Sequence, residues 1–248
     1  MPPVQKRTPP AAKTSTTRAA SLSSATDVLA WLRRHASKAA LASMARYNVP
    51  THNALGVTMG QLKALAKLTG TNHDLAADLW ATGVYEARMT AALIDDPVLV
   101  TSAQMDRWCK DFDNWGIVDT ACFALFDRTA HAWAKVPKWA TKKPEFERRA
   151  AFALLWGLTT HDKAAPDSRY LNGLALIETA ATDERHFVRK AVNMALRAVG
   201  KRNKALNAAA IRVAQRLADS GDPTARWNGR DALRELASAS VMRRIGLK

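Results

Sequence analysis

The sequence predicts an all-α protein built from stacked helical repeats, and three observations lead to that prediction. From Thr26 onward, apolar residues recur at spacings of three and four, which places them on one face of a helix. Glycine and proline separate these stretches, and no convincing run of alternating β-branched residues indicates a strand. Short segments that resemble one another recur along the chain, as they do in repeat proteins.

The helical stretches follow one another along the chain and are rich in alanine, the strongest helix former. Two examples of this spacing are Val28, Leu29, Leu32 and Ala36, and Leu62, Leu65, Ala66 and Leu68. Glycines and prolines that end or separate helices stand at Pro50, Gly56, Gly70, Gly83, Pro97, Pro137, Pro144, Pro166, Gly200 and Pro223.

Four later segments resemble one another, because each places a basic residue in the first turn of an alanine-rich helix. They are Glu86–Leu93, Glu147–Leu154, Phe187–Leu196 and Ala225–Leu233. In the intervening helix, Asp113–Phe126, Asp119 stands where the others have a basic residue. The steps from Arg88 to Asp119, Arg149 and Lys190 are 31, 30 and 41 residues, which suits HEAT-like helical pairs.

Equivalent positions of such repeats line one surface of the superhelix. We therefore expect a mostly cationic row on a concave face, formed by Arg88, Asp119, Arg149, Lys190 and either Arg226 or Arg230. The alternative is that these residues only form ion pairs between repeats.

The chain is strongly basic, with a net charge of +15 over 248 residues. Residues 1–24 hold four basic residues, four prolines and no acidic residue, and residues 201–248 hold eleven basic and four acidic residues. Such a charge favours polyanionic partners, although a basic surface without a ligand is the alternative. We expect residues 1–24 to form a disordered basic arm, rather than a transit peptide, and residues 25–248 to form the repeat domain.

The common motifs of metal, nucleotide and nucleophilic sites are missing, and the six histidines are scattered in the sequence. We therefore expect no metal and no cofactor. Cys109 and Cys122 stand in apolar surroundings and indicate a reducing compartment rather than a disulfide framework. No stretch of 18 apolar residues indicates a membrane span.

The segment from Asp113 to Asp119, D-N-W-G-I-V-D, is the best candidate for a functional site. Asp113 or Asn114 is suited to cap the helix that begins there. Trp115 and Asp119 are then four residues apart on one face, and an indole beside a carboxylate suits a positively charged ligand. The alternative places Trp115 in the core and makes Asp119 an ion-pair partner of a cation such as Arg149.

Several motifs, in order, resemble the DNA alkylation repair family of HEAT-like DNA glycosylases, the AlkD-like proteins. They are M-A-R-Y at Met44–Tyr47, A-L-G-V at Ala54–Val57, W-G-I-V-D at Trp115–Asp119, R-R-A-A at Arg148–Ala151 and F-V-R-K-A-V-N-M-A-L-R at Phe187–Arg197. The resemblance covers roughly residues 26–237. It implies a C-shaped superhelix of HEAT-like repeats that holds double-stranded DNA in a basic concave cleft.

The resemblance also implies the reaction, which is cleavage of the N-glycosidic bond of cationic N3- or N7-alkylpurines without base flipping. By motif match, Asp119 is the catalytic carboxylate. The side chains implied to line the DNA cleft are Trp115, Arg149, Arg148, Tyr47, Met194, Lys190 and Arg189. We expect a monomer in the cytoplasm, associated with the nucleoid.

One departure from the family pattern, at Met194, leaves two functions open. Met194 stands where the glycosylases carry a second cleft tryptophan, and methionine lacks the quadrupole of an indole. The alternative to excision is therefore a non-catalytic binder of branched or unusual DNA on the same fold. A protein-binding HEAT scaffold is a third hypothesis, because a fold does not determine a function.

Overall fold

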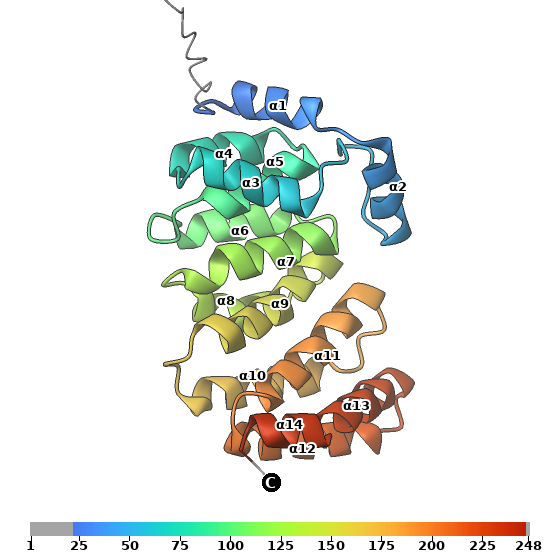
Figure 1. Cartoon of the computed structure of the whole chain (residues 1–248). Coiled ribbons are helices and arrows are strands. Elements are labelled where there is room, and N and C mark those ends of the chain that lie inside the picture. Colours follow the sequence, from blue (N-terminus) through green and yellow to red (C-terminus); the bar gives the residue numbers. More distant parts are fainter. Residues whose placement is uncertain (1–21, 247–248) are drawn as a thin grey trace, which may run out of the picture.

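The computed structural model describes residues 22–246, and the regular structure of this part is entirely helical (Figure 1). It contains fourteen α-helices and one short 3-10 helix, η1, with no strand in the described residues. The all-α prediction is confirmed. None of the described helices has the length and apolar character needed to cross a membrane.

The helices follow one another with short connections. Their bounds are α1 Ala25–Arg34, α2 Lys38–Arg46, α3 Met59–Thr69, α4 His73–Ala81, α5 Tyr85–Ile94, α6 Ser102–Lys110, α7 Trp115–Ala124, η1 Phe126–Arg128, α8 Ala132–Ala140, α9 Glu145–His161, α10 Asp167–Ala180, α11 His186–Gly200, α12 Lys204–Ala218, α13 Pro223–Leu236 and α14 Ala239–Arg244. The predicted basic arm, residues 1–24, falls almost wholly outside the described residues and stays a prediction, as does the domain boundary after it.

Two layers of helices run along the molecule, as HEAT-like repeats require. In one layer α5 packs on α7, α7 on α9, α9 on α11 and α11 on α13. The second layer includes α8, α10 and α12, and each of its helices packs on a neighbour in the first layer, as α8 does on α9 and α12 on α13. Figure 1 shows the resulting elongated stack, from α1 at one end to α12–α14 at the other. The HEAT-like prediction is confirmed.

Small residues let these layers approach closely. At Gly229 of α13 a Cβ atom would lie only 2.3 Å from the backbone nitrogen of Ala218, so only glycine fits against α12 there. Many alanines, such as Ala150 and Ala151 of α9, are fully buried between neighbouring helices. Close backbone packing of this kind explains the abundance of alanine in the sequence.

Helix α2 projects from the stack and is tied to it by a buried glutamate (Figure 1). Glu86 of α5 is fully buried, and its carboxylate accepts hydrogen bonds of 2.9, 2.7 and 3.1 Å from the backbone N–H groups of Leu55, Gly56 and Val57. Gly56 has a φ of +81°, and a Cβ atom there would lie 2.2 Å from the Ser37 carbonyl oxygen. The A-L-G-V motif therefore fixes the loop that holds α2 in place.

Candidate active site

The first turn of α7 positions the candidate catalytic residues. Asn114 caps this helix, because its side-chain oxygen accepts a 3.0 Å hydrogen bond from the backbone N–H of Ile117. Gly116 lets Tyr85 of α5 pack against the same turn, since a Cβ atom at position 116 would lie 2.7 Å from the tyrosine oxygen. The buried side of the turn thus packs on α5, and Trp115 and Asp119 are left only partly buried.

Asp119 is held by Arg149 of α9 in a bidentate ion pair. The guanidinium donates to both carboxylate oxygens, with N–O distances of 2.8 to 3.1 Å. Its remaining nitrogen donates a hydrogen bond of 2.8 Å to the Phe187 carbonyl oxygen, so the Arg149 side chain joins α7, α9 and α11. The Arg149 side chain is 4% exposed and that of Asp119 is 21% exposed. The carboxylate is therefore firmly oriented and still open to solvent on one side.

The surroundings of Asp119 are poorly hydrated. Burial raises the pKa of its carboxyl group, while the charge and hydrogen bonds of Arg149 oppose that rise. A charged carboxylate in such a place lacks part of the stabilisation that water would provide. It is suited to interact with a cation that enters the pocket, because few water molecules compete for it.

Trp115 connects α7 with the end of α2. Its indole N–H donates a 2.8 Å hydrogen bond to the backbone carbonyl oxygen of Tyr47. The Tyr47 side chain is 66% exposed, and it is followed by Asn48, which has a positive φ of 55°. The projecting helix α2 therefore ends beside Asp119, although 68 residues separate Tyr47 from Trp115.

Six of the eight predicted side chains line one open pocket of about 330 Å³. They are Tyr47, Trp115, Asp119, Arg149, Lys190 and Met194. We call this site the carboxylate pocket. It is formed by the N-terminal parts of α7, α9 and α11 together with the end of α2.

Arg148 and Arg189 lie outside the carboxylate pocket. Arg148 donates a hydrogen bond of 2.9 Å to the Asp183 carboxylate, and the guanidinium of Arg189 lies 4.7 Å from the centre of the Trp227 ring. Both precede a pocket residue in the sequence, and consecutive side chains on a helix point about 100° apart, so they face elsewhere. Trp227 also packs against Lys190, whose ammonium lies 5.2 Å from the ring centre, and thereby supports the rim of the pocket.

The predicted row of equivalent residues is only partly continuous. Asp119, Arg149 and Lys190 share the carboxylate pocket. Arg88 instead donates to the carbonyl oxygens of Trp80 and Asp111, and Arg226 donates to those of Ser220 and Gly221. Two ion pairs do join neighbouring repeats, Asp119 with Arg149 at 2.8 Å and Arg88 with Asp111 at 3.9 Å, and whether these residues have only that role stays open.

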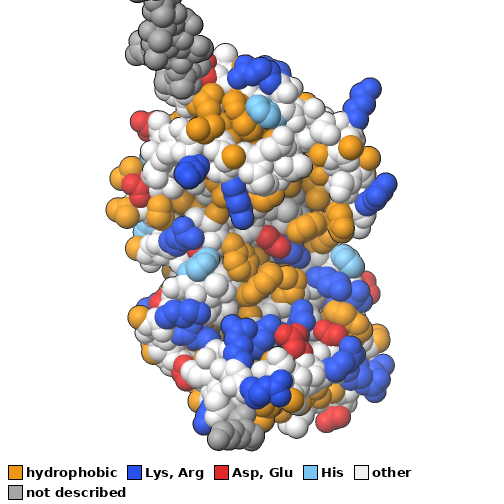
Figure 2. Space-filling model, in the orientation of Figure 1, with side chains coloured by type: hydrophobic (Ala, Val, Ile, Leu, Met, Phe, Trp, Pro, Cys, Tyr) orange, Lys and Arg blue, Asp and Glu red, His pale blue; other side chains and the backbone are white. Residues whose placement is uncertain are grey.

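Four residues of the pocket were not predicted from the sequence: Arg46, Asn48, His186 and Phe187. Each adjoins a motif that was recognised, because Arg46 lies within M-A-R-Y and Phe187 opens F-V-R-K. Figure 2 shows Lys and Arg side chains over much of one face of the molecule, with an apolar band across its middle. In the pocket itself Arg46, Arg149 and Lys190 outnumber the single carboxylate.

Among residues 22–246, no three or more His, Cys, Asp or Glu side chains are grouped as metal ligands. The two cysteines are free and buried, and burial raises the pKa of both thiols.

Stacked helical pairs with this pocket between their inner helices define the chain as a HEAT-like repeat protein. A family model described as DNA alkylation repair enzyme matches residues 28–236, and the chain belongs to this family. One similar solved structure comes from a protein family described as related to the HEAT-like repeat DNA glycosylases, with affinity for branched DNA structures. It is 22% identical, with a TM-score of 0.74, and the match covers 91% of this chain and 97% of that one. No curated protein sequence matches the chain.

Proposed function

We propose that the protein is a DNA glycosylase that hydrolyses the N-glycosidic bond of cationic N3- or N7-alkylpurines in duplex DNA. One observation carries the proposal: Asp119, held in place by Arg149, lies beside Trp115 in an open pocket. Membership of a DNA alkylation repair family supports it as well.

The chemistry needs little more than a preplaced carboxylate. An alkylpurine that already carries a positive charge is a good leaving group, so no general acid is required. Positive charge develops on the sugar as the bond breaks, and Asp119 stabilises that charge and orients the attacking water. Stabilisation by one such group is commonly worth about 3 kcal/mol. The indole of Trp115 adds cation–π attraction for the charged nucleoside.

The surrounding cations serve to hold the DNA. Arg46 and Lys190 line the pocket and are exposed, which suits them to contact phosphates on either side of the lesion. The exposed ring of Tyr47 is placed to pack on a sugar or base at the same edge. Because Asp119 lies in the wall of an open pocket, the proposed reaction needs no rotation of the lesion into an enclosed site.

The Asp119→Asn variant tests the proposal. Base release from duplex DNA that contains 7-methylguanine is expected to fall by about 100-fold or more. DNA affinity is expected to stay equal or to rise, because one negative charge leaves the pocket while the amide still accepts a hydrogen bond from Arg149. The opposite directions of the two effects separate catalysis from folding.

A matched control is Asp78→Asn, which removes the same charge from an exposed position on α4. It is expected to change neither base release nor melting temperature. No release above background by the wild-type protein, or full release by Asp119→Asn, would refute the proposed reaction.

A second candidate function is binding of branched DNA without excision. It is favoured by Met194, which lines the pocket in the place of a tryptophan, and by the affinity described for the family of the similar structure. Tighter binding of a four-way junction than of a lesion duplex, together with no base release, would support this candidate. Equal affinity for both DNAs would count against it.

A further inference from the structure

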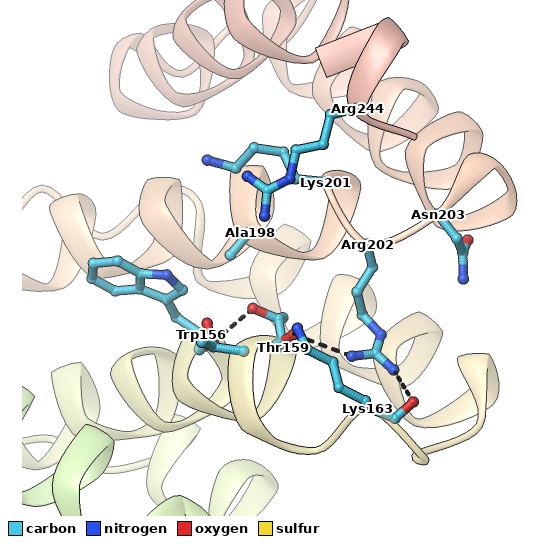
Figure 3. A pocket seen from close by; sticks show the side chains of 9 residues that line it. Trp156, Thr159, Lys163, Ala198, Lys201, Arg202, Asn203 and Arg244 are labelled. Carbon is cyan, nitrogen blue, oxygen red and sulfur yellow. Dashed lines mark hydrogen bonds between the residues drawn. The ribbon is translucent and has the colours of Figure 1, made fainter. Parts of the chain in front are cut away.

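A second cavity, which we call the basic cavity, lies at the opposite ends of α9 and α11 (Figure 3). Its volume is about 540 Å³, and it is closed on a third side by α14. Four cations, Lys163, Lys201, Arg202 and Arg244, line it together with the indole of Trp156. No carboxylate belongs to the lining, so the cavity is suited to an anion.

Two of the cations, Lys163 and Arg202, are held in place without being neutralised by a described carboxylate. Arg202 donates hydrogen bonds of 3.1 and 3.0 Å to the carbonyl oxygens of Thr159 and Lys163. Its guanidinium also lies 4.1 Å from the centre of the Tyr170 ring. Lys163 also donates to the Thr159 carbonyl oxygen, at 3.1 Å. These bonds satisfy the carbonyl groups at the end of α9, but they leave the positive charges uncompensated.

Three of the four cations have no carboxylate partner in the part of the chain that the structure describes. Within residues 22–246, Lys163, Arg202 and Arg244 form no ion pair, whereas Lys201 is paired with Glu235 at 2.6 Å. The Nε atom of Arg202 is also buried without a hydrogen-bond partner. Figure 3 shows Arg244 reaching from α14 toward Ala198, opposite Arg202. The uncompensated charges thus face one another across the cavity.

Trp156 forms the apolar end of the basic cavity. Its ring is only partly buried and is fixed by an edge contact with Phe123, with 4.5 Å between ring centres. A cavity of this volume is much larger than a phosphate ion requires and falls within the range of small-molecule sites. Cations at one end and an indole at the other match the two ends of a nucleotide.

A groove between the two sites shares one lining residue with the basic cavity and one with the carboxylate pocket. This groove of about 630 Å³ shares Asp119 with the carboxylate pocket and Trp156 with the basic cavity, and Lys63 and Arg128 also line it. Arg149 and Trp156 are seven residues apart on α9, which is two turns, or about 10 Å along the axis. A DNA strand that passes Asp119 would therefore reach the basic cavity within a few nucleotides.

We propose that the basic cavity binds one unpaired nucleotide of the DNA, distinct from the nucleotide that is hydrolysed. Its phosphate lies among Lys163, Arg202 and Arg244, and its base stacks on Trp156. The base must be unpaired and unstacked, because both faces of a base inside a duplex are covered by its neighbours. This inference rests on the proposed function only in taking DNA as the ligand.

Fluorescence anisotropy of the full chain with two DNAs tests the inference. One DNA is a fully paired duplex, and the other is the same duplex with a short single-stranded thymidine tail. The wild-type protein is expected to bind the tailed DNA about tenfold more tightly. Trp156→Leu and Arg244→Gln are expected to remove most of this advantage and to leave the affinity for the paired duplex nearly unchanged.

Matched controls are Trp31→Leu on α1 and Arg243→Gln on α14, since neither residue lines the basic cavity. Both are expected to keep the full advantage of the tail. Trp156→Phe retains a ring and is expected to keep part of it. Arg244 is exposed on the last helix, so its replacement tests the site without endangering the fold.

Equal affinity of the wild-type protein for the two DNAs would overturn the inference, as would an advantage that survives in both variants. Titration with thymidine monophosphate and with inorganic phosphate separates the other sources of the ligand. Binding of the free nucleotide without any advantage for the tail would also overturn the assignment to DNA. Base release by the wild-type protein is measured separately. If the wild-type protein releases no base but still binds the tailed DNA more tightly, the proposed function alone is contradicted.

Discussion

The carboxylate pocket and the basic cavity lie at opposite ends of the same helices, and only the carboxylate pocket is lined by an acidic side chain. The N-terminal turns of α7, α9 and α11 meet at the carboxylate pocket, whereas the C-terminal ends of α9 and α11 meet at the basic cavity. Helix N-termini stabilise negative groups and C-termini stabilise positive ones. Lys163 and Arg202 donate to carbonyl oxygens at the end of α9 and therefore complement that helix end, whereas Asp119 lies beyond the first turn of α7 and is paired with Arg149 instead.

The helix ends explain some of the charged side chains in the two sites but not the others. The helix ends account for the cations of the basic cavity that bind the carbonyl groups of α9. They do not account for the partly exposed indoles of Trp115 and Trp156, or for Arg244 without a carboxylate partner among the described residues. Those side chains distinguish the two sites as places for ligands.

The largest expected difference concerns stability. Arg149→Leu leaves the Asp119 carboxylate without its partner and removes the hydrogen bond to Phe187, so we expect the free energy of unfolding to fall by about 3 kcal/mol. Arg244→Leu, in the basic cavity, is expected to change it by less than about 0.5 kcal/mol, because Arg244 is exposed and forms no ion pair with the described residues. Urea unfolding followed by circular dichroism measures both.

A double variant shows whether the loss arises from the unpaired charge. Adding Asp119→Leu to Arg149→Leu removes the stranded carboxylate and is expected to restore a large part of the stability. If Arg149→Leu were no more destabilising than Arg244→Leu, the carboxylate pocket would not depend on a buried ion pair.

The second expected effect is on the pH dependence of base release. Burial raises the pKa of Asp119, against the opposing influence of Arg149, and in the proposed reaction it is the ionised carboxylate that stabilises the sugar cation. The enzymatic rate is therefore expected to fall about tenfold for each pH unit below that raised pKa. Release from 7-methylguanine duplexes between neutral and acidic pH, corrected for the uncatalysed reaction, measures this decline.

The fold is expected to survive the same acidification. Because the folded pKa of Asp119 is raised, its protonation does not destabilise the folded state. Burial alone would raise the pKa of Asp183 and Glu235, but Arg185 and Arg148 around the first, and Lys201 and Arg197 around the second, lower it. These groups stabilise the fold above the ordinary carboxyl pKa and lose that contribution only as pH falls through their lower folded pKa. Melting temperatures that decline together with base release would contradict the separation.

The sequence predicted the repeats and most of the carboxylate pocket, because both depend on local patterns. Trp115 and Asp119 share one helix face, and the steps between repeats placed Arg149 and Lys190 near them. Arg148 and Arg189, which the resemblance implied for the DNA cleft, lie outside the carboxylate pocket, since one position along a helix turns the side chain away from it, and their contact with DNA stays a prediction.

Two other features left no local signal in the sequence. Glu86 binds backbone N–H groups, which every residue except proline carries, so no motif marks its partners. The basic cavity assembles side chains from α9, α11 and α14, and its residues from Trp156 to Arg244 come together only in the folded chain. The carboxylate pocket was thus predictable from the sequence, and the basic cavity was not.

The smallest expected effect concerns the edge of the carboxylate pocket formed by α2. Tyr47→Leu is expected to weaken binding of duplex DNA by a few fold, because the exposed ring no longer packs on a sugar or base. Stability is expected to stay unchanged, since Trp115 bonds to the backbone carbonyl of Tyr47 and not to its side chain. Anisotropy and thermal melting measure the two effects, with Val98→Ala, another exposed apolar position, as the control. Equal DNA affinity of Tyr47→Leu and the wild-type protein would remove α2 from the DNA contact and leave the inner helices as the whole of that site.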